Sequence, residues 1–240
     1  MLFSRPLTTD PGVAPLLAPI KRRSFLTYAG ATTLALAGCH KNDATPGATD
    51  VGSGNIGVLN LAYALEQVEA AFYANVLAGS YYTKLAPASA EYQLLSDLAR
   101  HEQLHVDFLR TILSTNALKQ LNLTLSDKIS FDDRNTTAGP NKLSVLNAAR
   151  QLEDLGVRLY NGAAPFLLST DYLTVVGKIV SVEARHAALI RDLLAPNGFV
   201  GADVVDATSR QEISLSPTAA LAELNTYLAA DSQLTAIKLI

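Results

Sequence analysis

The motif Glu-x-x-His occurs twice in this chain, once as Glu102 with His105 and once as Glu183 with His186. On an α-helix, residues three apart lie on one face about 5–6 Å apart, so both side chains of a motif can bind the same metal ion. Two such motifs, with one more glutamate from each of two other helices, form the ligand set of a dinuclear metal centre inside a four-helix bundle. The doubled motif therefore predicts an all-α fold of this type.

The two halves of the chain repeat one pattern around these motifs. In each half an earlier glutamate is followed seven residues on by a tyrosine, and an arginine lies eight residues after the motif glutamate. These residues are Glu66, Tyr73 and Arg110 in the first half and Glu153, Tyr160 and Arg191 in the second. We therefore predict six metal ligands: Glu66, Glu102, His105, Glu153, Glu183 and His186. A bridging and a terminal carboxylate are expected from the helices that carry no motif.

The ligand types indicate which ions bind. Four glutamates carry four negative charges, which two divalent ions neutralise when the imidazoles are neutral, so a buried site is balanced. Carboxylates and imidazoles without thiolates suit iron or manganese. The predicted cofactors are two iron or manganese ions, and O2 or peroxide is the expected reaction partner.

Neighbouring polar residues compete for these roles. Glu69 lies one turn after Glu66 on much the same face, but the tyrosine spacing favours Glu66 as the ligand. Glu69 is expected at the rim of the site or behind the ligands. Asp154 points about 100° away from Glu153 and is expected to be exposed. His101 is expected at the surface or behind the ligands, and the two repeated arginines in helix-end salt bridges.

Apolar residues recur at three- and four-residue steps in four segments. We expect helices over residues 55–78, 89–114, 142–163 and 171–194, with Ser89 and Asp171 as N-caps and Phe108 on the inner face of the second helix. Residues 115–141 break the pattern, which predicts a long crossover between helices two and three. A last short helix is expected after Ser216-Pro217, outside the bundle.

The N-terminal region has the features of an export signal. Arg22-Arg23 precedes a short apolar run, as in twin-arginine signals, and the run ends at Leu36-Ala37-Gly38-Cys39, which resembles a lipobox. Residues 1–38 are thus predicted as a signal peptide and Cys39 as a lipid-bearing N-terminus, with an ordinary signal peptide as the alternative. Residues 39–54 read as a flexible tether. The expected location is the cell envelope, at the periplasmic or another extracytoplasmic face of a membrane.

Composition excludes some classes of protein. The single cysteine excludes an internal disulfide framework, and the net charge of −3 without a basic patch argues against nucleic-acid binding. The length of 240 residues suits one domain with appendages. We expect the bundle over residues 55–195 and a C-terminal extension over residues 196–240, and homo-oligomerisation is left open.

The segment from Leu65 to Tyr73, LEQVEAAFY, is similar to exported bacterial ferritin-like domain proteins, which are related to plant desiccation-related proteins. The resemblance spans about residues 55–195. It implies a ferritin-like bundle with the same six ligands, and Tyr73 and Tyr160 match tyrosines that stand behind the ligands in related bundles. A cysteine-rich rubredoxin-like module is missing, and the anchored N-terminus and extra C-terminal helix do not resemble a cage-forming ferritin. Both features argue against peroxide reduction through a second iron site and against bulk iron storage.

Three functions remain open at this point. The leading one is redox chemistry of a dimetal-carboxylate site with O2 or peroxide, as in oxidases, ferroxidases and catalases. The second is a non-enzymatic envelope protein that binds metal or protects against stress or desiccation. The third is a bare helical bundle. The residues do not decide whether the chain is an enzyme.

Overall fold

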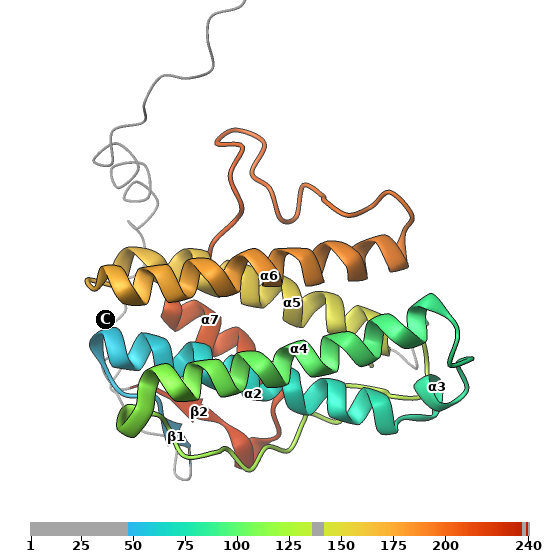
Figure 1. Cartoon of the computed structure of the whole chain (residues 1–240), viewed down its shortest axis with the longest axis horizontal. Helices are drawn as coiled ribbons and strands as arrows, with labels where there is room; N and C mark the ends of the chain where they lie inside the picture. The colour runs from blue at the N-terminus through green and yellow to red at the C-terminus, as the bar shows by residue number, and fades with distance from the viewer. Residues whose placement is uncertain (1–47, 136–141, 237–238, 240) are drawn as a thin grey trace, which may run out of the picture. The chain divides into compact units, whose positions relative to one another are not determined.

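The structure is a computed structural model that describes residues 48–135, 142–236 and 239. Four long helices dominate it (Figure 1). In chain order the elements are β1 (Thr49–Asp50), α2 (Gly54–Ala78), α3 (Ser80–Thr83), α4 (Ala90–Leu113), η1 (Ser114–Asn116), α5 (Val145–Ala163), η2 (Ala164–Phe166), α6 (Thr170–Leu194), α7 (Pro217–Leu224), η3 (Asn225–Tyr227), η4 (Ala230–Ser232) and β2 (Leu234–Thr235). The predicted all-α four-helix bundle is confirmed.

The long helices form two pairs. Helix α2 packs mainly against α4, and α5 mainly against α6, while α2 and α5 also contact each other. The crossover between α4 and α5 runs along the bundle, so that these two helices point the same way (Figure 1). It is held to α2 by buried amides: the backbone N–H of Leu118 donates to Asn60 at 3.0 Å, and that of Leu121 to Gln67 at 2.8 Å.

Serine side chains cap the N-termini of α4 and α6. Ser89 caps α4 as expected, since its hydroxyl accepts from the backbone N–H of Tyr92 at 3.2 Å. Helix α6 is capped by Ser169, whose hydroxyl accepts from Tyr172, so Asp171 as its cap is wrong and that residue lies in the first turn. Phe108 is 37% exposed and not on the inner face, because it lies about 120° around the helix from Glu102.

The C-terminal segment covers one side of the bundle. Leu221 and Leu224 of α7 are buried against α5 and α2, and Arg158 of α5 pairs with Glu223 of α7 at 2.6 Å. β2 pairs in parallel with β1. Residues 49–51, which we expected in the flexible tether, therefore belong to the folded unit, and Val51 is fully buried.

The predicted signal peptide, with Arg22-Arg23, and residues 39–47 of the predicted tether, with Cys39, lie outside the described residues. Among those that are described, no helix has the length and apolarity needed to cross a membrane.

Candidate metal centre

The four long helices bring all six predicted ligands together in the middle of the bundle. The four glutamates, Glu66, Glu102, Glu153 and Glu183, have no exposed surface, and His186 is 3% exposed. They come from α2, α4, α5 and α6 respectively, with His105 added by α4 and His186 by α6. Four fully buried carboxylates in one place are costly without a compensating positive charge.

These residues form two overlapping groups that could each hold a metal ion. One ligand atom from each member lies within 4.8 Å of the others in both groups. The first group is Glu66, Glu102, His105 and Glu183, and the second is Glu102, Glu153, Glu183 and His186. Glu102 and Glu183 belong to both. The carboxylates that belong to both groups are therefore those of the motif glutamates. We had expected a carboxylate from a helix without a motif in this role.

The two motifs interlock across the bundle. Nδ1 of His105 lies 2.8 Å from Oε1 of Glu183, and Nδ1 of His186 lies 2.8 Å from Oε1 of Glu102. Each histidine thus contacts the glutamate of the opposite motif as well as that of its own helix. His105 also contacts Glu66 at 3.2 Å, and His186 approaches Glu153 to 3.4 Å.

The repeated tyrosines link the two halves in the same reciprocal way. The Tyr73 hydroxyl of α2 donates to Oε1 of Glu153 on α5 at 2.5 Å, and the Tyr160 hydroxyl of α5 donates to Glu66 on α2. Burial, and then the charge of the carboxylate that each tyrosine contacts, raises the pKa of both hydroxyls well above the usual value. Both tyrosines therefore stay protonated and orient the two carboxylates that belong to only one group.

Several buried ligand atoms make no hydrogen bond of good geometry in the described part of the chain, although the histidine rings approach Glu102 and Glu183 to 2.8 Å. They include both oxygens of Glu102 and Glu183, Oε2 of Glu153 and Nδ1 of His186. Buried polar atoms are normally paired, and atoms left unpaired around one point are what a bound cation would satisfy. The mix of carboxylate and imidazole donors fits iron or manganese.

The shifted pKa values of the metal-free site also indicate that it would bind a cation. Burial, and then the negative charge of Glu153, raises the pKa of Glu102 to about 7. Burial and neighbouring glutamates raise the pKa of Glu183 well above its usual range. Burial alone would lower the pKa of His186, but its contacts with Glu102 and Glu153 raise it to about 11. Without metal, the cluster therefore retains protons that a cation would replace.

Glu69 is not at the rim of the site. It is fully buried, it belongs to neither group, and neither of its carboxylate oxygens has a hydrogen-bond partner among the described residues. Burial, and then the charges of Glu183 and Glu66, raises its pKa well above the usual range.

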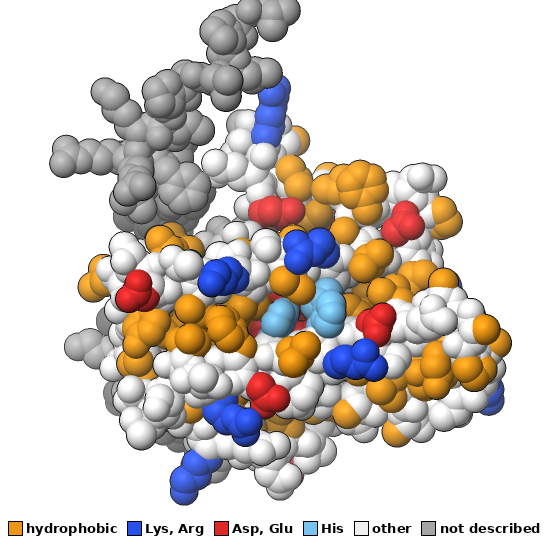
Figure 2. Space-filling view, in the orientation of Figure 1, with side chains coloured by type: hydrophobic (Ala, Val, Ile, Leu, Met, Phe, Trp, Pro, Cys, Tyr) orange, Lys and Arg blue, Asp and Glu red, His pale blue; other side chains and the backbone are white. Residues whose placement is uncertain are grey.

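His101 lies directly behind one candidate ligand. Its Nδ1 is 3.0 Å from Nε2 of His186, the ring nitrogen that faces away from the glutamates. Figure 2 shows histidine side chains at the surface between α4 and α6. His101 is thus both at the surface and behind a ligand, the two places expected for it. It lies one turn before His105, and residues four apart share a helix face.

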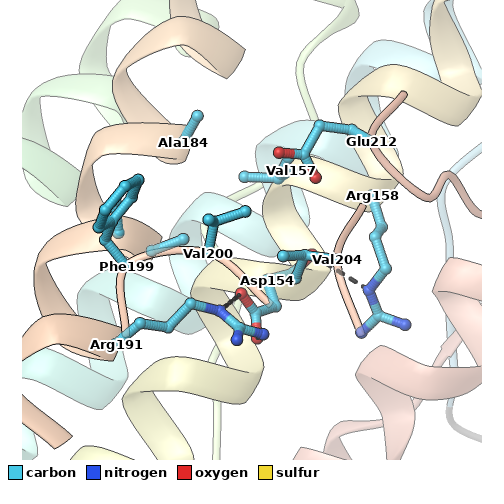
Figure 3. Close-up of a pocket in the computed structure, with 11 residues that line it drawn as sticks. Asp154, Val157, Arg158, Ala184, Arg191, Phe199, Val200, Val204 and Glu212 are labelled. Carbon is cyan, nitrogen blue, oxygen red and sulfur yellow. Dashed lines mark hydrogen bonds and ion pairs between the residues drawn. The ribbon is translucent and has the colours of Figure 1, made fainter. Parts of the chain in front are cut away.

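The repeated arginines are not equivalent in the structure. Arg110 pairs with Asp107 at 2.8 Å on the surface, as expected for a helix-end salt bridge. Arg191 is buried and makes two hydrogen bonds, of 2.9 and 2.6 Å, to the carboxylate of Asp154 (Figure 3). Asp154 is only 7% exposed, so the expectation of an exposed residue is wrong. It is buried because the chain after α6 folds back over it and adds Asp203 to the ion pair.

This ion pair borders a cavity of about 240 Å3 between α5, α6 and the segment that follows α6 (Figure 3). Phe199, Val200 and Glu212 of the segment after α6 line it. None of the six candidate ligands lines it, so it is a feature separate from the metal centre.

A four-helix bundle with a long crossover and a buried Glu/His cluster that could hold a metal defines a ferritin-like protein as a class. The family model described as ferritin-like domain matches residues 54–196, and the chain belongs to this family. No curated protein matches the chain.

Proposed function

We propose that this chain binds two iron or manganese ions and uses them for redox chemistry with O2 or peroxide. The observation that carries the proposal is the pair of overlapping four-residue groups that share Glu102 and Glu183. Two ions held by these residues would supply two-electron redox chemistry for O2 or peroxide. Four glutamates would balance two divalent ions in a site without exposed charge.

The residues around the six ligands support this role because they orient ligand side chains and determine which ring nitrogen carries a proton. Tyr73 and Tyr160 donate to Glu153 and Glu66 and so fix where these two carboxylates point. If His186 binds metal through Nδ1, its Nε2 carries the proton and donates to Nδ1 of His101. That bond would hold the ring of His186 in one orientation.

Replacing His105 by alanine tests whether the two ions act as a pair. We expect the rate of reaction with hydrogen peroxide or O2 to fall further than metal content, because one ion loses a ligand and the two become uncoupled. The measurement is metal per chain together with O2 uptake after addition of iron(II), and O2 release from peroxide. Gln103→Ala, an exposed change on the same helix, is the matched control and should alter neither quantity.

Two outcomes would change this assignment. An unchanged rate per bound metal in His105→Ala would contradict cooperation between the ions. A wild-type protein that binds both ions but reacts with neither oxidant would favour the non-enzymatic reading, in which the bundle is an envelope metal-binding or desiccation-related protein.

We also propose that the protein is exported by the twin-arginine route and anchored by lipid at Cys39. The support is the sequence alone: Arg22-Arg23, an apolar run too short to span a membrane, and a lipobox-like end. Because that route carries folded proteins, metal would be inserted before export.

Cys39→Ala is expected to move the protein from the membrane fraction to the soluble fraction, because the lipid is its attachment. Circular dichroism and metal content should not change, since Cys39 precedes the folded unit. The measurement is the distribution of the protein after a salt wash. A variant that still sediments with membranes would contradict the lipid anchor.

A further inference from the structure

Glu69 is a fully buried carboxylate that the six-ligand site does not use. It lies on α2 one turn after Glu66, and both its oxygens lack a hydrogen-bond donor in the described part of the chain. A buried carboxylate with no donor and no cation costs several kcal/mol, so a structural role alone does not explain it. A carboxylate that faces a bound cation would avoid this cost.

Comparison of the two halves of the chain shows which residue lies close to Glu69. Glu66 and Glu153 occupy equivalent positions in the two halves, and each has a tyrosine seven residues on. Three residues after them the halves differ: the first has Glu69 and the second has Gly156. A Cβ atom added at Gly156 would lie 3.1 Å from Oε2 of Glu183 and 3.4 Å from Oε1 of Glu69.

Gly156 therefore leaves the space that these two carboxylates occupy. Glu69 reaches from α2 to the surface of α5 and ends beside Glu183, one of the two glutamates shared by both groups. A side chain at position 156 would crowd this place, since 3.1 Å is tighter than most contacts that a Cβ makes. The halves are thus asymmetric at the centre, with one extra carboxylate and one missing side chain.

The extra carboxylate changes the charge balance. Two divalent ions neutralise Glu66, Glu102, Glu153 and Glu183, which leaves the charge of Glu69 uncompensated in a buried site. One more positive charge on the pair of ions would neutralise it. A proton on Glu69 would also supply it, but cations beside a carboxylate favour its charged form. In the loaded site the charge is then supplied by oxidation of one ion by one electron.

We infer that Glu69 is a fifth anionic group of the metal centre and that it favours the state with one divalent and one trivalent ion. The inference rests on the proposed function, because it requires that the centre hold two ions. It follows from a difference between the two halves of the chain, which have Glu69 in one half and Gly156 at the equivalent position of the other. It assigns Glu69 a positioning and charge-balancing role beside the six ligands.

The test compares wild type with Glu69→Gln, which keeps the shape of the side chain and removes its charge. Metal-free full-length protein is loaded anaerobically with iron(II) and then poised at fixed potentials with one-electron mediators, which accept the electron. The quantity measured is the ratio of the mixed-valence pair to the all-iron(II) pair, from the electron paramagnetic resonance signal. Glu212→Gln, which removes one exposed charge, is the matched control.

We expect Glu69→Gln to keep two irons per chain and to lower this ratio at least about tenfold at the same potential, because a full charge close to the ions is lost. Glu212→Gln should stay within about twofold of wild type, since exposed charges are screened. If Glu69→Gln does not fold, Glu69→Leu removes the same charge without leaving a polar atom to satisfy and repeats the comparison.

Two results would overturn the inference. An unchanged ratio would mean that Glu69 is neutral in the loaded protein, and loss of an ion from Glu69→Gln would make it an obligatory ligand. A wild-type protein that takes up no iron would contradict the proposed function itself. The wild-type iron count therefore separates failure of the inference from failure of the function.

Discussion

Replacing Glu102 or Glu183 by alanine is expected to remove metal from both positions at once. Each of these glutamates belongs to both four-residue groups, so its loss takes a ligand from two ions. Changes to residues that merely support a ligand already weaken metal binding about 10–100-fold, and the loss of a shared ligand should exceed this. Metal per chain, measured by elemental analysis after gel filtration, should fall close to zero.

Glu66→Ala and Glu153→Ala are the informative comparison. Each belongs to one group only, so each should lose mainly one ion. Asp107→Ala, a change at a partly exposed position on α4 outside both groups, should leave metal content unchanged. The assignment of the shared position would be contradicted if Glu102→Ala lost no more metal than Glu66→Ala.

The stability of the metal-free protein is expected to fall as pH rises from about 5 to 8. Burial raises the pKa of Glu102 from 4.5 to about 7, so the folded protein holds a proton there that the unfolded chain releases. A state that binds more protons is destabilised by rising pH, and Glu102 alone contributes about 3 kcal/mol between pH 4.5 and 7. The raised pKa of His186 acts in the same direction above pH 6.5.

In a bundle of this size the fall corresponds to a decrease in melting temperature on the order of 10 °C. Bound metal should abolish it, because the ions replace the retained protons and bind the native state only. The gain in melting temperature on adding iron(II) or manganese(II) should therefore be larger at pH 8 than at pH 5.5. The measurement is thermal unfolding followed by circular dichroism, with and without metal.

Glu102→Gln provides the matched test of the cause. It removes the carboxyl that retains the proton, so the metal-free variant should show a weaker pH dependence than wild type. Asp97→Asn, an exposed change on the same helix, should keep the dependence of wild type. A metal-free protein whose stability is level or rises between pH 5 and 8 would contradict the electrostatic account of the cluster.

The fold and the meeting of six residues followed from the sequence because both depend on short-range spacing. Glu102 and His105 share a helix face whatever surrounds them, and the repeat in the second half required a second helix of the same kind. The tyrosine offset also carried information across the chain, since Tyr73 and Tyr160 each reach the glutamate of the opposite half.

Features that depend on packing between distant segments did not follow. Asp154 was expected to be exposed because its helix face points away from the bundle, but the chain after α6 covers it and Arg191 neutralises it. Glu69 was expected at the rim of the site or behind the ligands, and the rim is wrong because the side chain is fully buried. Gly156 on α5 leaves room for it in the centre, and nothing near Glu69 in the sequence shows this. Residues 49–51 look like tether, yet they pair with a strand near the C-terminus.

The most direct test of the account is a titration of the metal-free full-length protein with iron(II) under anaerobic conditions, followed by its optical or magnetic signal. Glu102 and Glu183 shared between two groups predict saturation at two ions per chain, with the two ions magnetically coupled. Saturation of the wild-type protein at one ion would contradict the account. Metal uptake by Glu102→Ala and Glu183→Ala equal to that of wild type would also contradict it.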